Sequence, residues 1–160
     1  MTDPLVSLRE YLSYDPATGL FVWTKRSGRR DMTGRVAGYR GHNGCWYVRF
    51  SGRRYKAHRL AWFYVYGCWP VGDIDHINGN PSDNRIANLR EATPSQNQAN
   101  SRAREGRLKG AYLRPSGKWR AKIRKDGRNL HLGTFATAEE AHAAYWSAAQ
   151  RLFGEFARAA

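Results

Sequence analysis

The sequence of 160 residues predicts an α+β protein built from two small modules, and two observations carry this prediction. Residues 118–132 alternate between apolar and basic side chains around a tight turn, and a helix pattern follows them. Residues 1–100 instead mix short strand and helix patterns, and residues 101–109 carry four basic side chains without apolar periodicity. We therefore expect one module over residues 1–100, a basic linker over 101–109 and a second module over 110–160.

The first module begins with short elements that turn and capping residues delimit. Asp3 and Pro4 suit the start of a helix, and Gly67 would end an aromatic-rich helix over residues 58–66. The other expected elements are a turn at 15–19, a strand at 20–24, a basic loop at 25–41, and a hairpin of 45–50 with 54–57.

A compact polar block over residues 70–100 closes the first module. The pair Asp75-His76 ends an extended run and precedes an Asn78-Gly79 turn, and Asn88 lies on the return strand. Residues 93–96, Thr-Pro-Ser-Gln, form a capping box with proline at the first helical position, so the next helix would carry Asn97. This order predicts a hairpin followed by a helix.

The second module is expected to be a small antiparallel sheet packed on one helix. The strand side chains expected to face the core are those of Trp119, Ala121, Ile123, Leu130 and Leu132. Those expected to face outward are Lys118, Arg120, Lys122, Arg124, Asn129 and His131. The dipeptide at 126–127, Asp-Gly, marks the turn, and a capping box at 137–140 begins a helix that Gly154 would end.

Composition narrows the classes of partner. The net charge is +14 and aromatic residues make up 13% of the chain, which indicates a folded basic protein rather than a disordered tail. No apolar run approaches the roughly 18 residues of a membrane span, and the start lacks the form of a signal peptide. We expect a cytoplasmic protein without a membrane partner. Nucleic acid is the partner that the charge favours, with a basic housekeeping enzyme or a binder of anionic surfaces as alternatives.

The two cysteines, Cys45 and Cys68, are isolated in the sequence. Because they form no C-x-x-C pair, neither a structural zinc site nor a disulfide framework is expected. Any metal ion should be bound by oxygen and histidine ligands.

The basic face of the second module fits a nucleic-acid interface. Alternate residues of a strand lie roughly 7 Å apart, near the spacing of successive phosphates. A ribbon of strands fits the major groove of double-stranded DNA, where long basic side chains reach phosphates and base edges. A solvated strand face is the alternative, but such a face normally mixes charges of both signs.

Residues 110 to about 157 resemble the Apetala/ethylene-response-factor DNA-binding domain. The shared motifs are Gly110-Ala111-Tyr112, Gly117-Lys118-Trp119, Leu132-Gly133-Thr134-Phe135 and Thr137-Ala138-Glu139-Glu140-Ala141. The resemblance implies a three-stranded sheet that enters the major groove. Matching contact positions are Lys109, Tyr112, Arg114, Lys122, Arg124, Asn129 and His131. Because Tyr112 and His131 depart from the plant pattern, as does Ser116, the binding mode is expected to transfer but the sequence preference is not.

The polar block contains the groups that phosphodiester hydrolysis requires. A water molecule must lose a proton to a base, and a divalent cation must stabilise charge on the phosphate and the leaving oxygen. His76 is a natural base near neutral pH, and Asp75 on the other side of the strand is available to a metal ion. Asparagine oxygens can complete such a site or accept the histidine N–H. Ordinary turn chemistry is the alternative explanation for these residues.

Residues 15 to 100 resemble the HNH endonucleases common in bacteriophage genomes, in particular the free-standing homing type. The motifs that carry this resemblance are His58-Arg59-Leu60-Ala61-Trp62, Asp75-His76-Ile77-Asn78-Gly79-Asn80, Asp83-Asn84-Arg85-Ile86-Ala87-Asn88-Leu89-Arg90 and Gln96-Asn97. By position, His76 matches the general base, Asn88 the asparagine that orients it, and Asp75 and Asn97 the metal ligands. The implied fold is the ββα-metal motif around one Mg²⁺ or Mn²⁺, with a 5′-phosphate and a 3′-hydroxyl as products.

These observations predict a metal-dependent endonuclease that binds double-stranded DNA and needs no small-molecule cofactor. His58 is expected to be a packing or backbone-binding residue, and His42 and His142 to be structural or exposed. A monomer would nick one strand and a dimer could cut both, so the oligomeric state stays open. The alternative function is a non-catalytic DNA-binding regulator with a degenerate HNH scaffold.

Overall fold

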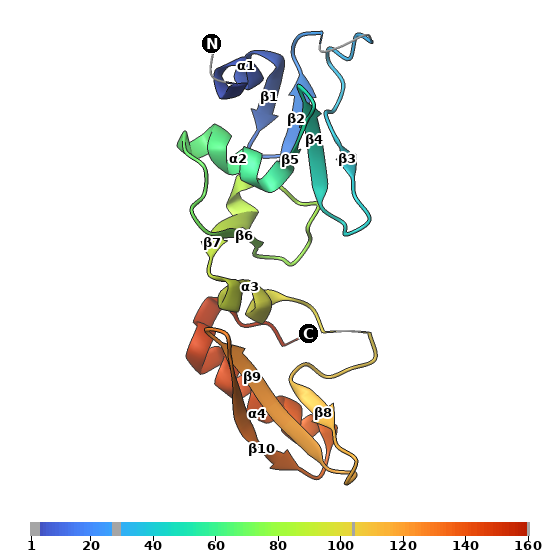
Figure 1. The fold of residues 1–160 in the computed structure, drawn as a ribbon, viewed down its shortest axis with the longest axis vertical. Coiled ribbons are helices and arrows are strands. Elements are labelled where there is room, and N and C mark those ends of the chain that lie inside the picture. Colours follow the sequence, from blue (N-terminus) through green and yellow to red (C-terminus); the bar gives the residue numbers. More distant parts are fainter. Residues whose placement is uncertain (1–3, 27–29, 104, 160) are drawn as a thin grey trace. The chain divides into compact units, whose positions relative to one another are not determined.

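The computed structural model describes residues 4–26, 30–103 and 105–159, so the expected helix cap at Asp3 lies outside the described residues. The chain divides into two compact units, Met1–Glu91 and Ala92–Ala160. Figure 1 shows the helices and strands of both units in chain order. The expected α+β class is confirmed.

The first unit joins short antiparallel sheets with two helices. Two strands pair as β1-β2, three as β3-β4-β5 and two as β6-β7. Its elements are α1 (Pro4–Tyr11), β1 (Leu12–Asp15), β2 (Leu20–Trp23), β3 (Tyr39–Arg40), β4 (Trp46–Phe50), β5 (Arg53–Lys56), α2 (Ala57–Tyr66), β6 (Asp73–His76), the 3-10 turn η1 (Ile86–Asn88) and β7 (Leu89–Ala92). The hairpin and both helices lie where the sequence places them, and strands β1 and β3 are additions, β3 within the loop expected at 25–41. Asn88 was expected on a strand and lies instead in η1.

The core of this unit lies between the helices and the sheets. Leu8, Leu12, Phe21, Val48 and Leu60 are its largest fully buried side chains. Helix α2 ends at Gly67, which adopts the left-handed conformation with φ of 74° and donates its N–H to the carbonyl of Phe63. The sequence-based helix end is therefore confirmed, and its cause is the absence of a Cβ atom at this residue.

The two helices of the first unit are also joined by polar groups. The guanidinium of Arg9 on α1 donates to the carbonyls of Phe63 and Tyr64 at the end of α2. The hydroxyl of Tyr64 in turn lies 3.1 Å and 3.0 Å from the carbonyl oxygens of Leu8 and Leu12. These bonds add side-chain donors to carbonyl groups at or next to the C-terminal ends of both helices.

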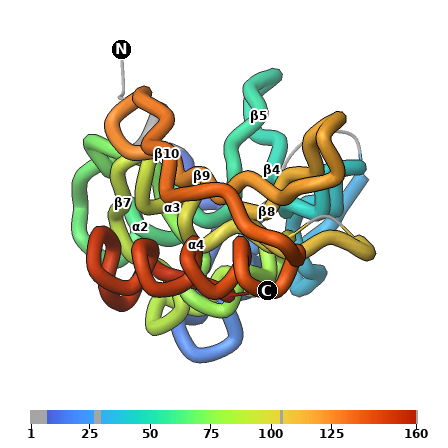
Figure 2. Tube along the Cα trace, turned by 90° about the horizontal axis from the view of Figure 1, so that it is seen from below, coloured from blue at the N-terminus to red at the C-terminus, as the bar shows by residue number. Residues whose placement is uncertain are grey.

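The second unit is a three-stranded antiparallel sheet with a long helix on one face. The strand order is β10-β9-β8, and Figure 2 shows α4 running beneath these strands. The elements are α3 (Pro94–Asn100), β8 (Ala111–Leu113), β9 (Trp119–Lys125), β10 (Arg128–Phe135), α4 (Ala138–Phe153) and the 3-10 turn η2 (Gly154–Phe156). Both expected capping boxes are present, at Thr93 with Gln96 and at Thr137 with Glu140.

Close packing fixes the sheet on α4. Ala121 and Ile123 of β9 are buried, as are Ala141 and Tyr145 of α4. Gly110 precedes β8 with φ of +80°, and a Cβ atom there would clash with the ring of Tyr145. Glycine at this position therefore satisfies both the backbone conformation and the packing on the helix.

Two expectations for the second unit change in the structure. Leu130 was expected to face the core, yet it is 39% exposed, because β10 is an edge strand whose register shifts between His131 and Gly133. The division between the units also precedes α3, because Ala99 packs in the core of the second unit and Ser95 accepts the backbone N–H of Asp126.

In the described part of the chain, no helix combines the length and apolar character needed to cross a bilayer.

Candidate active site and nucleic-acid interface

Asp75 and His76 end strand β6 and are both buried, with exposed fractions of 3% and 8%. Successive side chains of a strand point to opposite sides, so the Asp75 and His76 side chains have different neighbours. Strand β7 lies beside β6 and supplies Arg90, whose Nε donates to the Asp75 carboxylate over 2.9 Å. The buried carboxylate thus has a cation at its side.

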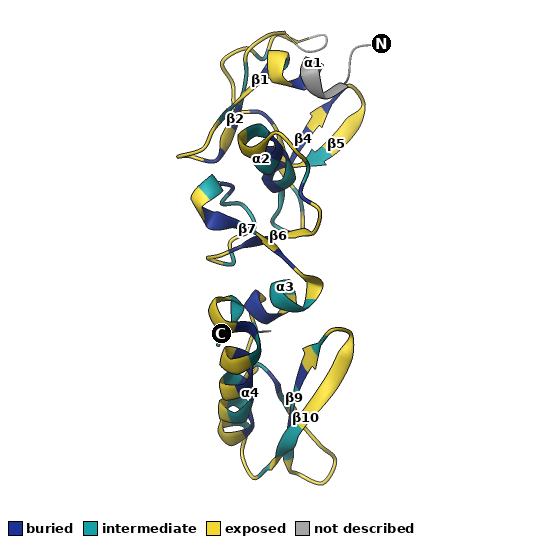
Figure 3. Ribbon diagram, turned by 90° about the vertical axis from the view of Figure 1, so that its left-hand side faces the viewer, coloured by how far each residue is buried: buried dark blue, intermediate teal, exposed yellow. Residues whose placement is uncertain are grey.

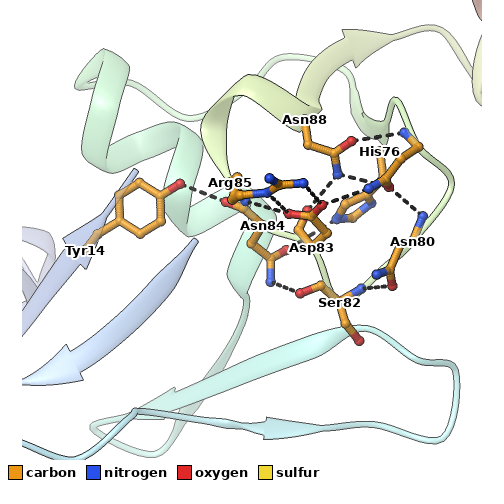
Figure 4. A network of polar contacts seen from close by, with 9 residues as sticks. Tyr14, His76, Asn80, Ser82, Asp83, Asn84, Arg85 and Asn88 are labelled. Atoms are coloured by element: carbon orange, nitrogen blue, oxygen red, sulfur yellow. Dashed lines mark hydrogen bonds and ion pairs between the residues drawn. The ribbon is translucent and has the colours of Figure 1, made fainter. Parts of the chain in front are cut away.

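A network of asparagine and aspartate side chains holds the loop between β6 and η1 (Figure 4). Asn78 and Asn88 bond reciprocally: the N–H of Asn78 donates to Asn88 Oδ1 over 3.0 Å, and Asn88 Nδ2 donates to Asn78 Oδ1 over 3.1 Å. Asn88 Nδ2 also donates to the carbonyl of Asp83 over 2.8 Å. Asp83 accepts both Asn78 Nδ2 and the guanidinium of Arg85, and its pKa falls to about 2, chiefly because of Arg85.

The turn at residues 15–19 supports this loop from the other side. The hydroxyl of Tyr14 donates to the carbonyl of Asn84 over 2.7 Å, and Ile86 N–H donates to the carbonyl of Pro16. Gly19, with φ of +74°, lies so close to the backbone of Asn84 and Arg85 that no side chain would fit. The β1-β2 hairpin therefore positions the residues that contact His76.

The His76 ring is held by Asn84, which is 3% exposed. Nε2 of His76 lies 3.3 Å from Oδ1 of Asn84, so Nε2 carries the ring proton and Nδ1 the lone pair when the imidazole is neutral. Burial lowers the pKa of His76 below its ordinary value, although the hydrogen bond to Asn84 and the charge of Asp75 act in the opposite direction. The ring is thus kept in the form that can accept a proton near neutral pH.

His58 at the start of α2 lies against His76, which the sequence did not predict. The two rings meet edge to face, with centroids 5.1 Å apart. Burial, followed by the charge of His76, lowers the pKa of His58 to about 3. Among the described residues, no hydrogen-bond partner reaches its buried Nδ1. The sequence signal that could have indicated this contact is the place of His58 at the start of one of the motifs quoted for the resemblance above.

Asn88 was expected to orient His76, and the structure gives its side chain different partners. Its side-chain amide donates to Asn78 Oδ1 and to the carbonyl of Asp83. Its backbone carbonyl accepts the N–H of Ile77, the residue after His76. The residue that contacts the ring is Asn84. Asn88 therefore acts on the loop that follows the histidine.

The expected metal ligands, Asp75 and Asn97, lie in different units of the chain. Asp75 ends β6, and Asn97 lies on α3 of the second unit. Among the described residues, no three His, Cys, Asp or Glu side chains cluster as a metal site. One carboxylate and one amide are hard oxygen donors, and Mg²⁺ binds through such small sets while it keeps several waters. The donor chemistry of the two residues therefore fits a hard divalent cation.

The sheet of the second unit presents the expected polar face, which Figure 3 shows as largely exposed along β10. The strand register aligns Tyr112 with Arg120, Lys122 with His131, and Arg124 with Asn129. Because paired residues share a face, these six side chains form one surface, called the basic face below. Arg114 and Lys118 lie exposed between β8 and β9.

Two observations describe the side chains of the basic face. The ammonium of Lys122 lies 4.5 Å from the centroid of the Tyr112 ring. The buried Nε of Arg120 has no hydrogen-bond partner among the described residues. The Nε–H of Arg120 therefore donates to no group of the described chain.

Lys109 does not belong to this face. Its ammonium donates to the carbonyls of Ala99, Ser101 (2.6 Å) and Arg158 (3.2 Å), and it thereby ties the end of α3 to the C-terminal segment. Burial, followed by the charge of Arg158, lowers the pKa of Lys109 to about 8, so it is charged at neutral pH. The structure thus places the Lys109 ammonium on backbone carbonyls, where it links segments of the second unit.

Comparison with known proteins gives two matches in different parts of the chain. Residues 55–99 match the HNH endonuclease family. A stretch of 84 residues is 36% identical to an uncharacterized HNH endonuclease of Acanthamoeba polyphaga mimivirus, covering 52% of this chain and 44% of that protein. A stretch of 55 residues is 53% identical to an ethylene-responsive transcription factor of Arabidopsis thaliana, covering 33% of this chain and 22% of that protein.

The chain therefore spans less than half the length of either relative. No solved structure matches it. Both resemblances inferred from the sequence are confirmed, the first at residues 55–99 and the second in the C-terminal region. Residues 55–99 are thus similar to the HNH endonuclease family, and the C-terminal region is similar to an ethylene-responsive transcription factor.

Proposed function

We propose that this protein is a metal-dependent endonuclease that hydrolyses phosphodiester bonds of double-stranded DNA. The observation that carries the proposal is the state of His76, a buried imidazole held by Asn84 and kept neutral by its surroundings, within the segment that matches HNH endonucleases. A neutral histidine with one fixed nitrogen is suited to general-base catalysis.

In the proposed reaction, His76 accepts a proton at Nδ1 from a water molecule. The water oxygen attacks phosphorus, and the bond from phosphorus to the 3′-oxygen breaks, which leaves a 5′-phosphate. The 3′-oxygen takes a proton from solvent and becomes a hydroxyl. Asn84 holds the ring during this transfer, and Asn88 fixes the loop behind it.

Asp75 and Asn97 are the proposed ligands of one divalent cation, Mg²⁺ or Mn²⁺. The cation, when bound, stabilises negative charge on the phosphate and on the leaving oxygen. The ion pair with Arg90 restrains the Asp75 carboxylate and balances its charge.

The basic face of the second unit is the proposed DNA anchor. Its lysine and arginine side chains suit phosphate contacts, and its width of three strands suits the major groove. Tyr112 and Lys122 form one pair on this face, and Arg124 lies beside Asn129. With one active site per chain, a monomer would nick one strand.

Supercoiled plasmid incubated with Mg²⁺, Mn²⁺ or EDTA tests the proposal. The unaltered protein should convert the plasmid to nicked or linear forms with either metal and leave it intact in EDTA. His76→Ala should slow this conversion by about 10²- to 10⁴-fold, the usual contribution of a general base. His42→Ala is the matched control, because His42 is exposed and lies outside the site.

DNA retardation on a gel separates the alternatives. If His76→Ala still retards DNA like the unaltered protein, the loss belongs to the chemical step. If the unaltered protein retards DNA but leaves the plasmid intact in both metals, the endonuclease proposal is wrong, and a non-catalytic DNA-binding regulator with a degenerate HNH scaffold describes the protein better.

A further inference from the structure

The second unit contains a cavity of about 610 Å³ that is lined partly by the basic face and partly by residues outside it. Residues on either side of position 104, among them Arg102 and Arg107, line it from the segment between α3 and β8. The opposite wall consists of β8 and β9 and includes Tyr112, Lys122 and Arg124. Described residues of the segment that the sequence predicts to be a linker therefore line part of this cavity.

The pocket is strongly basic and suited to an anion. Arg102, Arg107, Lys122 and Arg124 line it, and no acidic side chain does so among the described residues. Four cations around one cavity repel each other, so an anionic ligand would relieve this repulsion. Lys109 also borders the cavity, but its ammonium is bound to backbone carbonyls.

The size of the pocket decides what kind of anion it can hold. Its volume falls within the roughly 300–1,000 Å³ of small-molecule sites. A duplex cannot enter such a space, since its major groove alone is about 12 Å wide. One nucleotide with its phosphate fits the volume, which separates this pocket from the duplex-binding role of the basic face.

An aromatic ring borders the cations. Tyr112 is 45% exposed and lines the cavity, with the Lys122 ammonium 4.5 Å from its ring centroid. Grooves that bind single strands combine a basic track for the backbone with aromatic rings on which bases stack. The polar amide of Asn129 also lines the wall.

We propose that this pocket binds one nucleotide of single-stranded DNA, with its phosphate between the two basic walls and its base against Tyr112. The second unit would then bind either duplex DNA on its basic face or an unpaired nucleotide in the pocket, because the two sites share Tyr112, Lys122 and Arg124. This inference goes beyond the proposed function, because binding of a single strand does not require cleavage.

Fluorescence anisotropy in EDTA, with the full chain, tests the inference. The probes are a labelled thymidine hexanucleotide and a labelled 20-base-pair duplex. Arg102→Gln/Arg107→Gln should weaken binding of the hexanucleotide about tenfold more than binding of the duplex. It should also flatten the salt dependence for the hexanucleotide by about 1.4, or 0.7 for each of two lost phosphate contacts.

One charge-matched control and two variants of Tyr112 complete the test. Lys118→Gln/Arg120→Gln removes the same charge from residues that do not line the cavity, and it should weaken duplex binding more than hexanucleotide binding. Tyr112→Leu should weaken hexanucleotide binding by about 5- to 150-fold, the effect of one lost base stack, whereas Tyr112→Phe should preserve it.

The inference is overturned if both double variants weaken the two probes in equal proportion, since the pocket would then be part of the duplex interface. It is also overturned if Arg102→Gln/Arg107→Gln leaves hexanucleotide binding unchanged. Because the assay contains EDTA, failure of this inference and failure of the endonuclease proposal are separate results.

Discussion

The two polar regions of this protein differ in where they keep their polar groups. Around β6 and η1 these groups are buried, with Asp75, His76, Asn84 and Asn88 all less than 9% exposed. On the basic face of the second unit, Arg124, Asn129 and His131 are exposed. The comparison indicates two tasks: the first region fixes the protonation and orientation of single groups, and the second offers charge to a large partner.

The energetics of the regions should differ for the same reason. A buried ion or imidazole depends on each neighbour that replaces water, so removing one neighbour is costly. An exposed cation is already solvated, so its removal changes binding more than folding. Variants of buried and of exposed polar residues test this contrast.

The largest effect on stability is expected from Arg90→Met. The variant removes the guanidinium beside the buried Asp75 carboxylate, which should lower the free energy of unfolding by about 3–5 kcal/mol. Urea unfolding followed by circular dichroism measures this change. Lys25→Gln, which breaks the exposed ion pair with Glu10, should cost less than about 1 kcal/mol. Equal losses in the two variants would contradict the contrast.

A smaller, pH-dependent effect is expected from His58→Phe. Below pH 6.5 an unfolded His58 gains a proton, but the folded His58 does not until about pH 3, so stability falls as the pH falls. At pH 5 this difference amounts to about 2 kcal/mol, or 1.5 pH units at 1.36 kcal/mol each. Phenylalanine does not titrate, so the variant should lose about 2 kcal/mol less than the unaltered protein between pH 7 and pH 5.

Urea unfolding at the two pH values measures this difference. The groups that act on His58, namely His76, Lys56 and Arg59, are present in both proteins, so their own titration affects both curves. Parallel loss of stability in both proteins would show that His58 is not the buried neutral imidazole described here.

The smallest effect on folding is expected from Lys122→Gln/Arg124→Gln. Removing these cations from the basic face should change the free energy of unfolding by less than about 0.5 kcal/mol. The same variant should flatten the salt dependence of duplex binding by about 0.9 for each lost phosphate contact. Binding titrations in EDTA at several salt concentrations measure the slope. Arg151→Gln on α4 is the charge-matched control for one lost cation, and an equal slope change there would make the basic face an ordinary solvated surface.

Local features of the structure could be predicted because their causes are local. The capping boxes that begin α3 and α4 need only residues three apart, such as Thr93 and Gln96. The turn at Asp126-Gly127 has φ values of 48° and 80°, which these two residue types accept more readily than others. The alternation along β9 likewise placed Ala121 and Ile123 in the core. Asp75 and His76 were found because their motif is contiguous.

Contacts between distant segments decided what the sequence left open. His58 meets His76, Asn84 replaces Asn88 as the partner of the ring, and Lys109 turns from a presumed DNA contact to backbone carbonyls. Each of these contacts depends on which distant segment of the chain packs beside the side chain. A side chain's type fixes what it can donate or accept, and the packing of remote segments fixes which partner it finds. The sequence by itself thus determined the elements, the charge of the basic face and the chemistry available to the site, whereas the tertiary structure decided which residues contact His76.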